Sequence, residues 1–214
     1  MTTWPALLAL AAALPATAFK PWQTLRRGAL RHPWLAALVL LPWLWSTAAH
    51  LPGGLPVQLS MAALTVLMFG WPLACWSWLL VGCGAAWLAR PAVAADPAVW
   101  ALLAGELAFW NGVLPGSLAL AIGLATRRWL PAHPMVYILA RGFGTTLLAM
   151  AATGALWVLT QPPPAGADAE SLMLGRWLIA WGDAVTTGML TAIFVAYRPE
   201  WLLTWSDRRY LPPR

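Results

Sequence analysis

VQLSMAALTVLMFGWPLACWSWLLVGCGAAWLA is the stretch from Val57 to Ala89, and it contains no charged residue. As one helix, its 33 residues would be about 50 Å long, well beyond a bilayer hydrocarbon core of about 30 Å. Gly70 and Pro72 lie near its middle, and a proline removes a backbone donor and clashes with the preceding turn. We therefore expect two helices here, residues 57–69 and residues 72–89.

The composition of the whole chain indicates a membrane protein. Of its 214 residues, 61% are hydrophobic and only 9% are charged, whereas soluble domains carry about 25% charged residues. Only hydrocarbon accepts so much apolar surface, so lipid must cover most of the protein. The net charge of +6 is gathered in short segments between apolar runs. That pattern is typical of cytoplasmic loops and argues against a nucleic-acid partner.

The apolar runs predict an all-α, polytopic transmembrane helical bundle that forms a single domain over residues 1–214. About seven spans are expected: residues 4–19, 34–50, 57–69, 72–89, 98–126, 135–160 and 172–197. The first run resembles a signal peptide, with Ala16, Thr17 and Ala18 as its cleavage site, but no Lys or Arg precedes it. We interpret it as a retained helix, and cleavage of the leader is the alternative.

The distribution of basic residues predicts the orientation of the bundle. Residues 20–33, 127–134 and 198–214 are rich in Lys and Arg, whereas residues 50–56 and 161–170 have none. Because cytoplasmic loops are the basic ones, three crossings are needed between residues 50 and 127, and the split at Pro72 supplies the third. The expected topology has the N-terminus outside and the C-terminus inside a bacterial cell membrane, with Arg90 and Arg176 as basic exceptions on the outer side.

Three ionisable residues stand out within the predicted spans, where charge is costly and often functional: Glu106, Arg141 and Asp183. Asp183 lies near the midplane and is predicted either to line a polar path or to form a structural ion pair with Arg141. The long side chain of Arg141 can instead reach outward to the membrane surface. Glu106, about 12 Å below the outer surface, is expected to face an outer vestibule or to bond to a neighbouring helix.

Asn111 interrupts the fifth span and is followed by Gly112, Pro115 and Gly116. The Gly-x-x-x-Gly spacing allows two helices to approach closely, which predicts close packing with a proline kink. The alternative is a broken helix whose freed carbonyl groups face a binding site.

Neither catalysis nor a preformed metal site has a motif in the chain. Protease, nucleotide-binding and hydrolase signatures are missing from the sequence, so we expect no enzymatic activity and no resident cofactor. Cys75 and Cys83 are eight residues apart, about 12 Å along a helix, too far for a disulfide between them. Of the three histidines, only His50 falls on the predicted outer side.

Three segments carry a resemblance to a known family. Residues 50–80 read HLPGGLPVQLSMAALTVLMFGWPLACWSWLL, residues 111–122 read NGVLPGSLALAI, and residues 182–202 read GDAVTTGMLTAIFVAYRPEWL. They resemble the cobalt and nickel permeases of the energy-coupling-factor transporters over roughly residues 34–202. The last segment, with its acid, its Thr-Gly pair and its closing Arg-Pro-Glu, is the most specific.

The resemblance implies a membrane permease, or substrate-capture subunit, for a divalent transition metal such as cobalt or nickel. The implied partners are a small membrane subunit, a coupling subunit and ABC ATPases. Asp183 and Asn111 would then lie near the family's central site. The family's metal ligands include a Met-His start, whereas this chain begins Met1-Thr2-Thr3-Trp4. His50 is therefore the candidate metal ligand of what would be a divergent member.

Two functional hypotheses make different structural predictions. A permease predicts that His50, Glu106, Asn111 and Asp183 converge on one outward-facing cavity. A non-transporting membrane scaffold or assembly factor predicts that these polar groups pair among themselves without a cavity.

Overall fold

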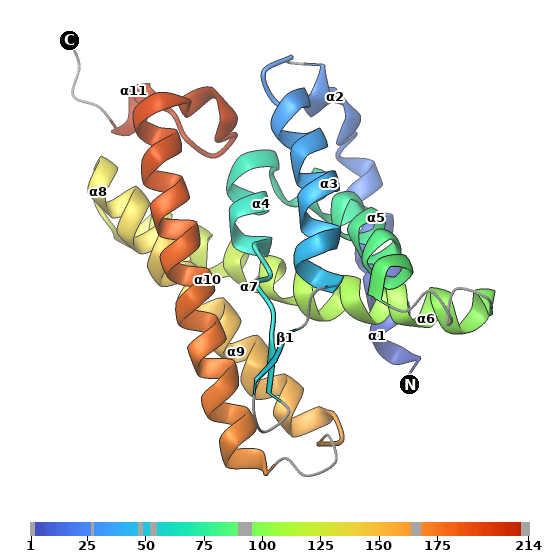
Figure 1. The fold of residues 1–214 in the computed structure, drawn as a ribbon. Helices are drawn as coiled ribbons and strands as arrows, with labels where there is room; N and C mark the ends of the chain where they lie inside the picture. Colours follow the sequence, from blue (N-terminus) through green and yellow to red (C-terminus); the bar gives the residue numbers. More distant parts are fainter. Residues whose placement is uncertain are drawn as a thin grey trace.

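The computed structural model describes residues 3–26, 28–46, 49–51, 55–89, 96–163 and 168–210, and for residues 49–51 and 55–57 it describes the backbone alone. Arg90 lies outside these ranges, as do residues 52–54. The described chain is almost entirely helical, with one short hairpin of two strands (Figure 1). The predicted helical architecture is confirmed.

The elements follow one another along the chain with short connections. In order they are α1 (Trp4–Ala18), α2 (Trp22–Leu25), α3 (Arg31–Ser46), β1 (Ala49–Leu51), β2 (Leu55–Val57), α4 (Ala62–Phe69), α5 (Trp71–Ala89), α6 (Pro97–Ala108), η2 (Phe109–Val113), α7 (Leu114–Trp129), α8 (Pro134–Val136), η3 (Tyr137–Gly144), α9 (Thr145–Thr160), α10 (Ala169–Tyr197), η4 (Pro199–Trp201) and α11 (Asp207–Tyr210).

Four helices are long and apolar enough to cross a membrane. They cover residues 71–88, 97–129, 134–160 and 169–197. The second and third are continuous helices that contain π-helical turns, η2 and η3. Large apolar side chains such as Leu14 and Leu159, 70% and 78% exposed, project from the surface of the bundle. A membrane protein is expected to present such a surface to lipid.

Two aspartates cap helices α6 and α10 at their N-terminal ends. Asp96 accepts hydrogen bonds from the backbone N–H groups of Ala98 and Val99, and Asp168 accepts one from Ser171. These carboxylates bind N–H groups that have no partner within the helix. Hydrogen bonds from the side chain and then the backbone of Ser171 hold the pKa of the Asp168 carboxyl below its ordinary value.

The structure corrects the predicted helix over residues 57–69. Val57 ends strand β2, and the helix begins only at Ala62, so α4 has eight residues and a length of about 12 Å. The predicted break is confirmed, because Gly70 has φ +75° and separates α4 from α5. The predicted span 34–50 also ends early, at Ser46 in α3. Hydrophobicity alone could not distinguish strand β2 and the residues after it from the start of a helix.

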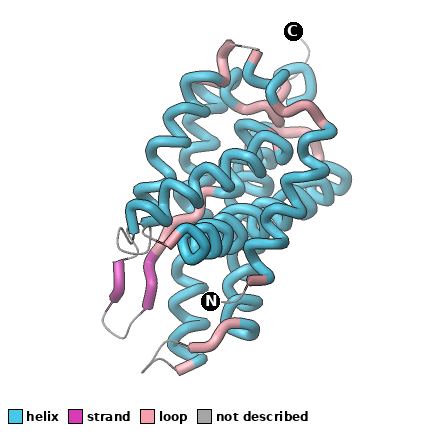
Figure 2. Tube along the Cα trace, turned by 90° about the vertical axis from the view of Figure 1, so that its right-hand side faces the viewer, coloured by secondary structure: helices cyan, strands magenta, loops and turns pink. Residues whose placement is uncertain are grey.

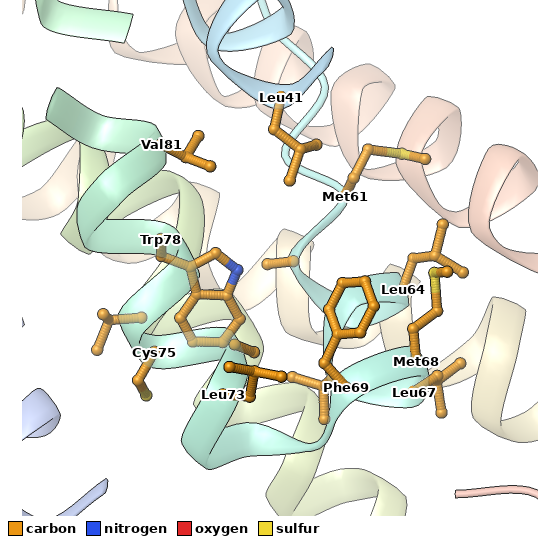
Figure 3. Packing of buried hydrophobic residues seen from close by; sticks show 14 of the residues in the cluster. Leu41, Met61, Leu64, Leu67, Met68, Phe69, Leu73, Cys75, Trp78 and Val81 are labelled. Atoms are coloured by element: carbon orange, nitrogen blue, oxygen red, sulfur yellow. The ribbon is translucent and has the colours of Figure 1, made fainter. Parts of the chain in front are cut away.

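Helix α4 lies inside the protein rather than at its surface. All eight of its residues are buried, and it packs against α5, α7 and α10 (Figure 1). Figure 2 shows the helical bundle from the side, with the two strands of the hairpin at one edge. Figure 3 shows side chains of α4 meeting Leu41 of α3 and Leu73 and Trp78 of α5 in one apolar cluster. A helix this short can lie at membrane depth because protein surrounds it and binds the polar groups at its ends.

Two glycines of the fifth predicted span make room for Trp78. A Cβ placed on Gly112 would lie 2.5 Å from Trp78 Cγ, and one placed on Gly116 would lie 2.1 Å from Cη2. The indole is fully buried, and its Nε1 donates to Thr65 Oγ1 at 2.9 Å. The close packing predicted from the Gly-x-x-x-Gly spacing is present, with the side chain of Trp78 filling the groove.

Candidate functional site

Asp183 of α10 binds the start of the buried helix α4. Its side chain is fully buried, and its two carboxylate oxygens accept hydrogen bonds from the backbone N–H groups of Ser60 at 3.0 Å and Met61 at 3.1 Å. The N-terminus of a helix carries partial positive charge and unpaired N–H groups, so a carboxylate there is favourable. Met61 has φ +56°, a left-handed conformation that turns the chain into α4.

Ser60 connects Asp183 to the fifth predicted span. Its hydroxyl donates to the backbone carbonyl oxygen of Asn111 at 2.6 Å and accepts from the N–H of Ala62 at 3.1 Å. Pro115 has no N–H to offer the carbonyl four residues before it, which is that of Asn111. The helix continues through η2 rather than breaking, and the carbonyl left without its usual α-helical donor bonds to the chain before α4.

Buried hydroxyl groups extend this connection along α10. Thr187 and Thr191 follow Asp183 at intervals of four residues and thus lie on the same helix face. Both are fully buried, and in the described part of the chain neither hydroxyl has a hydrogen-bond partner. We call Asn111, Ser60, Asp183, Thr187 and Thr191 the polar line.

The segment after α10 binds the opposite end of α4. The backbone N–H of Leu203 donates to Met68 O at 3.1 Å, and that of Thr204 donates to Leu67 O at 3.2 Å. The Thr204 hydroxyl bonds to the same Leu67 carbonyl at 3.0 Å. These are carbonyl groups at the end of a helix, which have no partner within it. Helix α10 and its tail therefore hold both ends of α4.

A cavity of about 320 Å³ adjoins one end of the polar line. Its lining combines polar side chains with indole rings and leucines, and consists of Gln58, Leu103, Glu106, Leu107, Trp110, Asn111, Trp157 and Arg176. The volume is within the range of small-ligand pockets, about 300–1,000 Å³. We call it the α6–α10 cavity. Glu106 and Asn111, two of the predicted site residues, thus meet in one pocket. Asp183 does not line it and is connected to Asn111 through Ser60.

Arg176 enters this cavity from the first half of α10. Its guanidinium lies 4.1 Å from the centre of the Trp157 ring, a cation–π contact. Gly154 of α9 makes space for the arginine stem, because a Cβ there would come within 2.8 Å of Arg176 Cβ. The sequence singled out Arg176 only as an exception to the charge rule.

Arg141 lies away from Asp183, and the predicted ion pair between them does not form. Its Nη1 donates to the hydroxyl of Tyr210 at 3.3 Å, and its guanidinium lies 5.3 Å from the ring centre of Tyr137. In the described residues, the single salt bridge is that of Arg198 with Glu200. Arg141 is buried, and the alternative prediction, an arginine reaching toward the membrane surface, stays a prediction. Tyr137 precedes Arg141 by four residues on the same helix, whereas Tyr210 comes from the tail, which spacing within one helix cannot locate.

His50, the predicted metal ligand, is placed only as part of the backbone. It pairs with Pro56 in the β1–β2 hairpin. The structure describes only the backbone of this residue. In the part of the chain that the structure describes, His, Cys, Asp and Glu side chains form no group of three that could hold a metal ion. The proposed convergence of His50 with Glu106, Asn111 and Asp183 therefore stays a prediction.

Sequence reasoning missed the residues that connect the site. Ser60 and Gln58 are ordinary polar residues at the start of the apolar run over residues 57–89, and Trp110 is one of 17 tryptophans in the chain. The signal that could have found Ser60 is Pro115, because its missing N–H leaves a carbonyl that needs another donor.

Comparison with known proteins assigns the chain to no family: no protein-family model, curated protein or solved structure matches it.

Proposed function

We propose that this chain is a membrane-embedded permease, or substrate-capture subunit, of an uptake system of the energy-coupling-factor type. The observation that carries the proposal is the α6–α10 cavity, which adjoins the polar line at Asn111. Buried polar groups are costly in a membrane and commonly mark the path of a substrate. A cavity at one end of such a line is the arrangement a capture subunit needs.

The ends of the bundle support the proposed orientation. Helix α1 begins toward one end of the molecule and α11 lies toward the other (Figure 1), as expected for an odd number of crossings. Arg209 in the tail donates to the backbone carbonyl of Arg127 at 3.2 Å, so two of the basic segments meet. We propose that this basic end faces the cytoplasm and could contact the coupling subunit and ABC ATPases, and that the hairpin and cavity face outward.

An accessible cysteine provides the test of this proposal. In a variant without Cys75 and Cys83, Leu103→Cys places a thiol on the cavity wall. We expect a membrane-impermeant maleimide added to intact cells to label it, because thiolate forms only where water reaches it. Leu178→Cys is the matched control: it lies on α10 and is 58% exposed at the predicted lipid-facing surface. It should stay unlabelled. A Leu103→Cys protein that reacts only in inverted vesicles would contradict the proposal.

A membrane scaffold is the second candidate function, and Asp183 favours it. Both carboxylate oxygens of Asp183 are occupied by backbone N–H groups, so this residue has a structural role. The scaffold hypothesis accounts for Asp183 and Ser60 but leaves the α6–α10 cavity without a role. A capture subunit accounts for the cavity and also for Asp183 and Ser60, which hold the start of α4.

The transition-metal cargo depends on His50 and has its own test. Purified protein in detergent is titrated with nickel, cobalt, copper and zinc, and the metal content is measured by elemental analysis. We expect stoichiometric binding in the wild type and its loss in His50→Ala. His133→Ala is the control, because His133 caps α8 at the basic end. A folded wild type that binds none of the four metals would refute the metal cargo.

A further inference from the structure

The unpaired polar groups of the α6–α10 cavity are all hydrogen-bond donors. The Nε of Arg176 and the Nε1 of Trp110 are buried, and neither has a hydrogen-bond partner in the described part of the chain. Trp110 is only 6% exposed. Both residues line the cavity, and the described lining has no unpaired buried acceptor. Leaving a buried donor unpaired is costly, so a ligand that offers acceptor oxygens would remove a penalty already present in the empty site.

The position of the guanidinium is fixed before any ligand arrives. Gly154 accepts the stem of Arg176 against α9, and the Trp157 ring lies against its guanidinium at 4.1 Å. A guanidinium is planar and binds a carboxylate with two parallel hydrogen bonds. The remaining wall, with Leu103, Leu107 and two indole rings, suits an apolar body.

From these groups we infer that the α6–α10 cavity binds a small organic carboxylate with a compact apolar body, Arg176 and the Trp110 N–H holding its carboxylate. This inference rests on the proposed capture function and adds an organic ligand in this cavity to the metal ion whose test concerns His50. Glu106, on the same wall, carries the opposite charge to Arg176 and would disfavour a ligand with two negative charges.

Three probes that share one ring separate the contribution of the carboxylate from that of the ring. Benzoate, benzyl alcohol and benzylamine are titrated into the purified full-length protein in a non-ionic detergent, and heats of binding are measured. We expect saturable binding of benzoate alone. Arg176→Gln should weaken it by about 10- to 100-fold, as expected for a charge-assisted pair worth about 1.5–3 kcal/mol. Arg176→Lys, which keeps the charge without the planar fork, should give an intermediate affinity.

Trp110→Phe tests the second donor without removing the charge. It keeps an aromatic ring and deletes the N–H, so we expect about fivefold weaker binding, the equivalent of one neutral hydrogen bond. Trp100→Phe is the matched control. Trp100 also has a buried, unpaired Nε1 but does not line the cavity, so its replacement should leave the benzoate affinity unchanged.

Some outcomes would overturn the carboxylate without touching the capture function. Benzylamine binding as well as benzoate, or a benzoate affinity unchanged in Arg176→Gln, would refute the inference. So would a Leu103→Cys thiol that is labelled from outside but gains no protection from benzoate. A Leu103→Cys thiol that is not labelled from outside contradicts the proposed function itself.

Discussion

Asp183→Asn will destabilise the protein more than any other replacement of a single acid among the described residues. The carboxylate accepts two backbone N–H groups, at 3.0 and 3.1 Å, in a fully buried position. Asparagine offers one acceptor oxygen, and its amide group would face the second N–H as donor against donor. Losing a buried, charge-assisted contact of this kind costs about 3 kcal/mol. For a chain of this length, that corresponds to roughly 6–12 °C in Tm.

The measurement is thermal unfolding in detergent, with retention of the monodisperse peak as a second readout. Glu170→Gln is the control: it is the same chemical change on the same helix, at an exposed position in the first turn. It should unfold like the wild type. An Asp183→Asn protein as stable as Glu170→Gln would show that the carboxylate does not hold the start of α4.

Gly116→Ala will disrupt the packing between α5 and α7. The new Cβ would lie 2.1 Å from Trp78 Cη2 and 2.5 Å from Cζ2, distances that packed atoms do not adopt. The indole cannot move aside cheaply, because it is fully buried and its Nε1 donates to Thr65. Inserting a methyl group into such a core typically costs about 1–3 kcal/mol, and more where neither side can shift. We expect a loss of about 3 kcal/mol and reduced yield of folded protein.

Gly123→Ala is the control on the same helix. Its Cβ would meet only Arg141 side-chain atoms at 3.8 Å, an ordinary contact. Because alanine favours helix over glycine by about 1 kcal/mol, this variant should be as stable as the wild type or slightly more stable. The double variant Gly116→Ala with Trp78→Phe removes the ring atoms that clash, so it should recover part of the loss. Equal stability of Gly116→Ala and Gly123→Ala would contradict the packing described for Trp78.

The candidate site was only partly predictable from the sequence. Charge at membrane depth is rare, so Glu106 and Asp183 could be singled out without a structure. Their partners could not, because hydrogen bonds in the site join residues far apart in the chain. Asp183 bonds to Met61, 122 residues away, and Ser60 bonds to Asn111, 51 residues away. The expected partner of Asp183 was Arg141, yet the structure gives it backbone N–H groups that no residue pattern reveals.

By itself, the sequence determined the helical architecture, the apolar surface and the break at Gly70, because these depend on local composition and on the backbone limits of glycine and proline. The tertiary structure decided what lies on either side of that break. Helix α4 is too short to be stable alone. It is held because Asp183 of α10 binds the N–H groups of the two residues just before it, and the tail binds its last carbonyls. The same long-range packing brings Arg176 beside Trp157, since a cavity forms from helices that meet only after the chain has folded.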